Sequence, residues 1–176
     1  RLARTTSAGG ASLERMQRLA KTATHITTET ASAAAMSDRL LFTGCYTSGT
    51  PFLFGTPGAG ILAFSVGADG ALTPLSGGKA VPAGTNPTYL VANKGGTRLY
   101  CSNECDPSTV CAFAIDRTPG AELLTPLNSA PAEGSAACWA SLSPDENFLL
   151  AVNYTSGSVV SFPITDSGVG EAVCVA

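Results

Sequence analysis

Residues 86–104 read NPTYLVANKGGTRLYCSNE, and residues 136–154, fifty positions further on, read AACWASLSPDENFLLAVNY. The two stretches align without a gap, and hydrophobic and polar residues fall in matching places. Asn103 aligns with Asn153 at the end of the second hydrophobic run. The chain therefore contains an internal repeat of about 50 residues, and this repeat predicts the fold class before any chemistry is considered.

A second motif recurs with a spacing of 49 residues. It reads ILAFSV at residues 61–66, VCAFAI at residues 110–115 and VVSFPI at residues 159–164. Repeats of 40 to 50 residues made of short, β-rich segments are typical of propeller blades, in which each blade is an antiparallel sheet of four strands. We therefore predict an all-β protein, a β-propeller with four antiparallel strands per blade.

Turn residues and β-forming segments divide each repeat into strands. The middle repeat is complete, whereas the first repeat lacks its first strand and the last reaches a fourth strand only near Glu171. Closed propellers need about four to eight blades, so the chain is expected to be the N-terminal part of a longer protein or to complete its ring by assembly. The predicted strands are 41–46, 60–66, 71–75, 88–92, 98–103, 109–115, 122–128, 138–142, 148–152 and 158–164.

The composition excludes several classes of function. Hydrophobic residues make up 44% of the chain and charged residues only 13%, with a formal net charge of −3. A nucleic-acid groove would need clustered Lys and Arg, and no apolar run approaches the ~18 residues of a membrane span, so neither partner is expected. No cofactor fingerprint is present, and the six cysteines lack a trusted metal-ligand spacing, with the single histidine at His25. We expect neither cofactor nor metal, and the thiols are interpreted as structural.

Residues 1–36 differ from residues 37–176, which are interpreted as the folded domain. The first segment is rich in Ala, Thr and Ser, and its basic residues outnumber its two acids, Glu14 and Glu29. This bias matches a mitochondrial or plastid transit peptide, and a disordered tail without a targeting role is the alternative. A cytoplasmic location is predicted unless residues 1–36 direct import.

Several short motifs carry a resemblance to a known family. They occur in the family's order and read FTGCYTSG at 42–49, GILAF at 60–64, DGALTPL at 69–75, NPTYL at 86–90, LYCSNE at 99–104 and FLLAVNY at 148–154. The chain resembles the seven-bladed β-propeller lactonases, which include bacterial-type 6-phosphogluconolactonase and fungal 3-carboxy-cis,cis-muconate cyclase. The resemblance implies about three, partly incomplete, blades of an expected seven.

The resemblance also implies chemistry on a small-molecule lactone without a metal. Glu104 matches the family's Asn-Glu at a strand end and is the candidate catalytic acid or base. Asn103, Asn153 and Tyr154 are candidates for orienting substrate through hydrogen bonds. Structural alternatives stay open, because Asn at a strand end often caps a turn, Tyr154 could pack between blades and Glu104 could be a solvated rim residue.

Trp139 is a departure from the family pattern. It stands where the family commonly has a histidine, and an indole cannot transfer a proton near neutral pH; we keep Trp139 as a candidate substrate contact. Residues 37–176 contain no histidine and only five basic residues. The full-length parent is therefore expected to be the lactonase, and this stretch alone to be inactive. The alternatives are a carboxymuconate-type cycloisomerase and a non-catalytic propeller that binds a protein through the loop 47–59, with Phe52-Leu-Phe54 at its centre.

Overall fold

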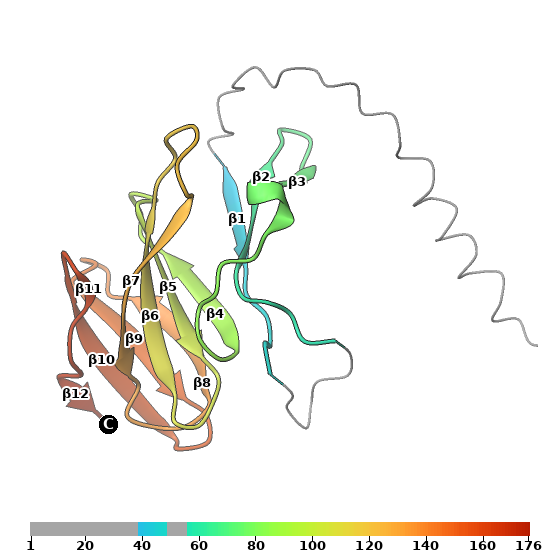
Figure 1. Cartoon of the computed structure of the whole chain (residues 1–176). Helices are drawn as coiled ribbons and strands as arrows, with labels where there is room; N and C mark the ends of the chain where they lie inside the picture. Colours follow the sequence, from blue (N-terminus) through green and yellow to red (C-terminus); the bar gives the residue numbers. More distant parts are fainter. Residues whose placement is uncertain (1–38, 49–55) are drawn as a thin grey trace, which may run out of the picture. The chain divides into compact units, whose positions relative to one another are not determined.

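Three antiparallel sheets follow one another along the chain in the computed structural model, which describes residues 39–48 and 56–176 (Figure 1). All of these residues belong to one compact unit, Ala35–Ala176. Its elements are β1 (Leu40–Thr43), β2 (Leu62–Val66), β3 (Leu72–Pro74), the 3₁₀ turn η1 (Ser76–Gly78), β4 (Pro87–Ala92), β5 (Arg98–Asn103), β6 (Thr109–Ile115), β7 (Leu124–Pro131), β8 (Ala137–Leu142), β9 (Phe148–Asn153), β10 (Ser158–Thr165), β11 (Gly168–Val169) and β12 (Cys174–Val175).

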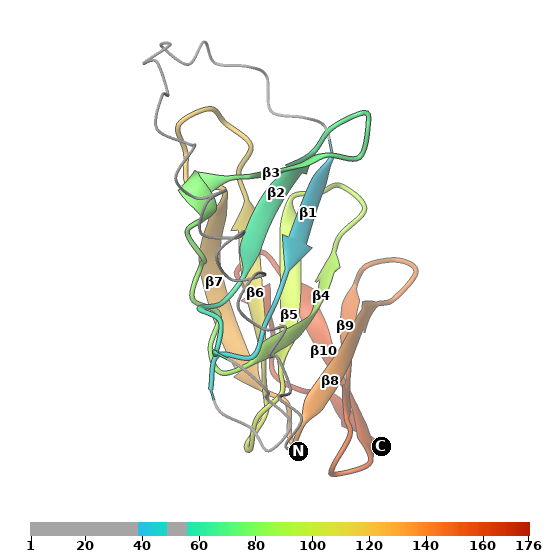
Figure 2. The same ribbon diagram turned by 90° about the vertical axis from the view of Figure 1, so that its right-hand side faces the viewer.

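Each sheet is one repeat of the sequence. The first blade has the order β1-β2-β3, the second β4-β5-β6-β7, and the third β8-β9-β10-β11, with β12 also paired to β10. The first strands of the second and third blades, β4 and β8, contact each other, and Figure 2 shows them in neighbouring positions. The predicted all-β class and the four-stranded antiparallel blade are confirmed.

The turns have the chemistry that hairpins require. Asn93 accepts hydrogen bonds on Oδ1 from the amides of Thr97 and Arg98, both at 2.9 Å, and Gly96 takes the positive φ of +62° that closes the β4–β5 hairpin. In the equivalent β8–β9 hairpin, Asp145 accepts a hydrogen bond from the amide of Asn147. The repeat equivalent of Asn93 is Ser143, whose Oγ accepts a hydrogen bond from the amide of Phe148 at 3.0 Å. Short polar side chains in these turns thus replace missing backbone partners.

Hydrophobic cores lie between consecutive blades. Leu99 and Phe113 of the second blade are 2% and 1% exposed and pack in the core shared with the first blade. Leu149 and Phe162, their equivalents in the third blade, are both 0% exposed and pack in the core shared with the second blade. The conserved spacing of Leu and Phe in the repeat therefore specifies the face that each blade presents to the blade before it.

A side-chain amide also joins the second and third blades. Asn128 of β7 donates from Nδ2 to the carbonyl of Val169 at 2.6 Å and accepts from the Val169 amide at 3.0 Å. The Asn128 side chain thus makes the two hydrogen bonds to β11 that the backbone of a neighbouring strand would otherwise make. The sequence did not predict β11, because two residues are too short to give a periodic pattern.

Some predicted strand limits were wrong for identifiable reasons. β1 ends at Thr43 rather than Tyr46, and the chain then passes so close to the Pro87 carbonyl at Gly44 that no Cβ would fit. β2 begins after Ile61, which instead pairs with Val81 in an isolated bridge. β7 runs from Leu124 to Pro131, later than predicted, and its pairing with β6 contains a bulge.

Two predictions concern residues outside the described ranges. The tail 1–36 and the Phe52-Leu-Phe54 part of the loop 47–59 both lie there, so they stay predictions. No helix among the described residues is long and apolar enough to cross a membrane.

Candidate functional site

Glu104 follows directly on β5, and its carboxylate is held by two hydroxyl groups. Oε2 accepts a hydrogen bond from the Tyr46 hydroxyl and another from the Thr88 hydroxyl, each at 2.9 Å. Tyr46 follows β1 in the first blade, whereas Thr88 belongs to β4 in the second. Within the described residues no hydrogen bond reaches the other oxygen, Oε1. The carboxylate is therefore fixed through one oxygen and offers the second as an acceptor.

The orientation of Thr88 comes from a β-bulge. The register between β4 and β5 shifts between Pro87 and Tyr89, and the register between β8 and β9 shifts at the equivalent place, around Cys138. A bulge leaves one residue out of the ladder and redirects its side chain, and bulges are common beside active sites. Thr88 and Cys138 are thus repeat equivalents at the same position of their blades.

The backbone of Glu104 is held by Asn86. The Glu104 amide donates to the Asn86 carbonyl at 2.9 Å, and Asn86 Nδ2 donates to the Glu104 carbonyl at 3.0 Å. Asn86 Oδ1 in turn accepts from the amides of Thr47 and Ser48, at 2.9 and 3.0 Å. Asn86 has φ +54°, a left-handed conformation that Asn tolerates better than most residues. It therefore joins the segment after β1 to the end of β5.

Tyr46 is kept as a neutral donor. Burial is the largest cause that raises the pKa of its phenol above the ordinary 10.0, followed by its hydrogen bond to Glu104 and the negative charge of that carboxylate, with a smaller effect of Cys138. Ionised Tyr46 would place two negative groups in contact, which is unfavourable. At neutral pH the hydroxyl therefore continues to donate to Glu104.

The two candidate asparagines are buried, both 0% exposed. Asn103 Nδ2 donates to the carbonyls of Ala83, at 2.5 Å, and Thr85, at 3.1 Å. Asn153 Nδ2 makes the equivalent 2.7 Å hydrogen bond to Ala132. Both amides join the segment that leads into a blade to the end of the second strand of that blade. Their side chains therefore position the backbone and do not themselves face a ligand.

The side-chain amide oxygens of Asn103 and Asn153 differ in their hydrogen bonding. Cys111 donates its thiol hydrogen to Asn103 Oδ1 at 3.1 Å, and Cys101, directly opposite Cys111 in the ladder, lies 3.8 Å from the same oxygen. The hydrogen bond with Cys111, together with burial, raises the pKa of Cys101 far above its ordinary value. Among the residues that the structure describes, Asn153 Oδ1 is buried without a hydrogen-bond partner. All six cysteines of the chain are free thiols.

Trp139 and Tyr154 are exposed. Trp139 is 38% exposed, and its ring lies 6.3 Å from that of Tyr89, centroid to centroid, across β8 and β4. Tyr154, the repeat equivalent of Glu104, is 79% exposed. Within the described part of the chain, no hydrogen bond links either residue to Glu104. The structure therefore groups Glu104 with Tyr46 and Thr88 rather than with the other predicted site residues.

Sequence reasoning missed Tyr46, Thr88 and Asn86. A usable signal existed for Tyr46, because the repeat aligns it with Glu104, at the position just after a second strand. Thr88 carried no such signal, since its orientation depends on a bulge that a strand pattern does not reveal.

The Glu104 cluster has no basic neighbour in hydrogen-bond contact among the described residues. Lys94 and Arg98 lie at the opposite end of β4 and β5, where Lys94 donates to the Pro144 carbonyl and Arg98 to that of Asp166. The cluster can accept a proton or a hydrogen bond, but cationic contacts to an anionic substrate would have to come from elsewhere.

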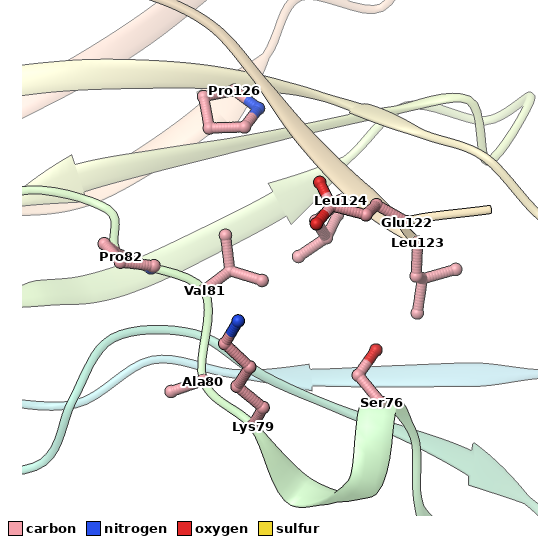
Figure 3. Close-up of a pocket in the computed structure, with 9 residues that line it drawn as sticks. All are labelled: Ser76, Lys79, Ala80, Val81, Pro82, Glu122, Leu123, Leu124 and Pro126. Atoms are coloured by element: carbon pink, nitrogen blue, oxygen red, sulfur yellow. The ribbon is translucent and has the colours of Figure 1, made fainter.

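A separate cavity of about 270 Å³ lies between the segment after η1 and the start of β7. Figure 3 shows Lys79 and Ser76 on one side and Glu122 on the other, and the apolar side chains of Val81 and Leu124 also line the cavity. None of the predicted site residues lines this cavity, so it is distinct from the Glu104 cluster.

The three repeat-equivalent blades match a known protein family. The family profile described as "Lactonase, 7-bladed beta-propeller" matches residues 40–175. The chain belongs to this lactonase family. The resemblance inferred from the short motifs is thereby confirmed over nearly all of the described residues.

Individual proteins similar to this chain carry names of the same kind of enzyme. A 6-phosphogluconolactonase of Bacillus subtilis (strain 168) is 38% identical over 84 residues, which are 47% of this chain and 24% of that protein. A Bacteroides uniformis structure provisionally assigned as a 6-phosphogluconolactonase matches with TM-score 0.63 and 28% identity, covering 78% of this chain and 37% of that one.

The third comparison is a Pseudomonas aeruginosa periplasmic gluconolactonase, PpgL, with TM-score 0.63 and 25% identity, covering 78% of this chain and 38% of that one. This member of the lactonase family thus spans about a quarter to two fifths of the length of these relatives.

Proposed function

We propose that the whole protein is a 6-phosphogluconolactonase-type lactonase, which hydrolyses a small sugar-acid lactone, and that these blades supply its general base. The observation that carries the proposal is the Glu104 carboxylate, fixed through Oε2 by Tyr46 and Thr88 and without a partner among the described residues at Oε1. A carboxylate held in this way is suited to take a proton from water.

In the proposed reaction Glu104 Oε1 accepts a proton from a water molecule, whose oxygen attacks the lactone carbonyl. The carbonyl oxygen becomes an oxyanion that needs hydrogen-bond donors. When the tetrahedral intermediate collapses, the ester bond to the ring oxygen breaks, and that oxygen becomes a hydroxyl group by taking the proton that Glu104 received, which restores the carboxylate. Water is consumed and an open-chain acid is formed.

The other candidate residues have proposed supporting roles. Asn103 positions Glu104 by fixing the strand end that precedes it, and Asn153 does the same for Tyr154. Trp139, together with Tyr89, offers an exposed aromatic surface that suits a sugar ring. Tyr154 offers a hydroxyl group at the position equivalent to Glu104. The anionic groups of the substrate would bind basic residues outside the described blades.

The proposal is tested in a chimera. Residues 39–176 replace the matching blades of the Bacillus subtilis 6-phosphogluconolactonase, and hydrolysis of 6-phosphogluconolactone is measured above its spontaneous rate. Glu104→Gln should lower kcat/KM by at least about 100-fold, the usual loss for a general base. The matched control is Glu122→Gln, at the separate cavity, which should leave the rate unchanged. An active chimera that tolerates Glu104→Gln would refute the role of Glu104.

A non-catalytic propeller is the second candidate, favoured by the absence of histidine from residues 37–176 and by Trp139 at the family's histidine position. The chimera separates the two candidates through Trp139→His. If the blades belong to an active lactonase, the chimera is active with Trp139; if activity appears only with Trp139→His, these blades have lost catalytic competence. Assay of the same chimera with a carboxymuconate tests cycloisomerisation.

A cytoplasmic location is also proposed, and the basic, acid-poor composition of residues 1–36 supports mitochondrial or plastid import as its alternative. A fluorescent protein fused behind residues 1–36 distinguishes them. Diffuse fluorescence supports the cytoplasm, and organelle fluorescence that is lost when the arginines of this segment are replaced by glutamine supports import.

A further inference from the structure

A polar cavity lies between the second and third blades, at the end of β4 and β5 that is opposite to Glu104. Its volume is about 310 Å³, close to the lower limit of about 300 Å³ for small-molecule sites. Its walls come from the β4–β5 hairpin, the β8–β9 hairpin and the segment that joins β10 to β11. All the lining residues belong to these two blades, each of which has four strands here, so the cavity is formed by neighbours that are both present.

Two residues of β5 that line this cavity depart from the internal repeat. Arg98 corresponds to Phe148 of β9, and Tyr100 corresponds to Leu150. The third blade thus has only apolar side chains at the two positions where the second blade has a guanidinium and a phenol. Packing of a blade does not require these polar groups, because the repeat forms the same strand without them. Both polar groups line one cavity, which indicates a role in binding.

The hydroxyl group of Tyr100 is a buried donor without a protein acceptor. Tyr100 is 1% exposed, its ring packs in the core shared with the third blade, and among the described residues no hydrogen bond reaches its hydroxyl group. Burial is the largest cause that raises the pKa of the phenol above 10.0, while the charge of Arg98 lowers it and that of Glu146 raises it. Because Arg98 and Glu146 both line the cavity, we infer that the hydroxyl group faces it, as a neutral donor.

The carboxylate of Glu146 lies on the wall that the third blade supplies. Glu146 has φ +60°, and its repeat equivalent is Gly96, with φ +62°. A left-handed backbone favours glycine, so a glutamate here carries a steric cost. The carboxylate is half-buried, and its Oε1 accepts a 2.7 Å hydrogen bond from the Lys94 amide, whereas no hydrogen bond reaches Oε2 from any described residue. One carboxylate oxygen is therefore fixed and the other is available to a ligand.

Opposite charges line this cavity without contact between them. Arg98 donates one long hydrogen bond, of 3.3 Å, to the carbonyl of Asp166, and no ion pair within the described ranges joins Arg98 to the carboxylate of Glu146 or Asp166. A ligand with a negative charge alone would face the carboxylates, and one with a positive charge alone would face the guanidinium. A molecule that carries both charges provides a partner for each wall.

We propose that this cavity binds a small zwitterion, a free α-amino acid with a small side chain. Its carboxylate accepts hydrogen bonds from the Arg98 guanidinium and the Tyr100 hydroxyl group, and its ammonium group donates to Glu146. The ligand thereby joins the second blade to the third. The inference does not depend on the proposed catalytic function, because neither Glu104 nor the residues that hold it line this cavity.

The experiment titrates glycine and L-alanine into the isotope-labelled full chain and follows the backbone amides by NMR. Saturable shifts should appear at Thr97, Asn147 and Thr165, which line the cavity. Acetate and methylammonium each carry only one of the two charges and should bind at least about tenfold more weakly than glycine. Glucose, a neutral polyol, should not shift these amides.

Three variants test the proposed contacts. Arg98→Gln and Glu146→Gln should each weaken glycine binding at least about tenfold, since each removes one charged partner. Tyr100→Phe removes only the hydroxyl group and should weaken binding about threefold or more. Lys79→Gln, which removes an exposed cation at the separate cavity after η1, is the matched control and should bind glycine like the wild type. Spectra without ligand verify that the variants fold.

Thermal denaturation gives a second measurement. Glycine should raise the Tm of the wild type and of Lys79→Gln, but not that of Arg98→Gln, because a ligand that binds only the folded state stabilises it. The proposal is overturned if glycine produces neither a saturable shift at the cavity nor a rise in Tm. It is also overturned if acetate, methylammonium or glucose binds there as tightly as glycine, or if Arg98→Gln and Glu146→Gln bind like the wild type.

Discussion

Tyr46 and Glu104 belong to different blades, and the Tyr46 hydroxyl donates a 2.9 Å hydrogen bond to Oε2 of Glu104. The two residues are repeat equivalents, each placed just after a second strand, so the contact joins the same corner of adjacent blades. One blade supplies a carboxylate at this corner and the other a phenol. Equivalent positions in two adjacent blades thus carry a hydrogen-bond acceptor and its donor.

The Tyr46 hydrogen bond predicts a pH-dependent stability. Because the pKa of Tyr46 is raised above 10.0 in the folded protein, its stabilising contribution is fully present below pH 10 and is lost as pH rises through the folded pKa. Tyr46→Phe should lower the free energy of unfolding by about 1 kcal/mol at pH 8, and the difference from wild type should shrink toward pH 11. Urea denaturation across this range provides the measurement.

Tyr154→Phe is the control for this prediction, because Tyr154 is 79% exposed and should contribute little to stability. Ultraviolet difference spectra between wild type and Tyr46→Phe report the ionisation directly. A tyrosinate signal from Tyr46 that rises well below pH 10 would contradict the prediction.

The repeat in the sequence was sufficient to predict the blades. Hydrophobic spacing and turn residues located the strands, since both are local properties of the chain. The environment of Glu104 could not be predicted in the same way, because Tyr46 lies 58 residues earlier and reaches Glu104 only through the packing of two blades. The bulge at Thr88 depends on the register between β4 and β5, which a single strand does not encode.

Asn103 illustrates a different limit. The repeat placed Asn103 and Asn153 at equivalent positions, but it did not distinguish a ligand contact from a structural contact. The structure places both amides on backbone carbonyls in the interior. The distinction depends on burial, and a polar residue at a strand end is compatible with either environment.

Asn103→Ala should lower the free energy of unfolding by about 2–3 kcal/mol, because the carbonyls of Ala83 and Thr85 lose their shared donor. Thermal and urea denaturation measure the change. Ser129→Ala, at an exposed position of β7, is the control and should be neutral. A cost of Asn103→Ala below about 0.5 kcal/mol would show that water replaces the amide without loss.

Asn153 Oδ1, which has no hydrogen-bond partner within the described ranges, predicts a stabilising role for a thiol introduced beside it. Cys111 donates to Asn103 Oδ1, and the repeat equivalent of Cys111 is Val160, which is fully buried. Val160→Cys should be tolerated better than Val160→Ala, which should cost about 2 kcal/mol as a buried truncation. The cysteine fills more space than alanine and provides the missing donor to Asn153.

The reciprocal variant, Cys111→Val, should leave Asn103 Oδ1 without its closest donor and destabilise the protein by about 1–2 kcal/mol. Urea denaturation of the three variants under reducing conditions gives the comparison. Equal costs for Val160→Cys and Val160→Ala would mean that the thiol does not reach Asn153.

Ala136 has φ +57°, and its repeat equivalent Asn86 has φ +54°. The left-handed conformation is tolerated by Asn but disfavours Ala, for which the Cβ is too close to the following carbonyl. Ala136→Gly should therefore raise the free energy of unfolding by about 0.5–1 kcal/mol, because glycine adopts this conformation without the steric cost. Ala140→Gly in β8 is the matched control and should lower it by about 1 kcal/mol, since Ala140 is buried in a regular strand. If both substitutions destabilise the protein equally, the left-handed conformation at Ala136 carries no strain.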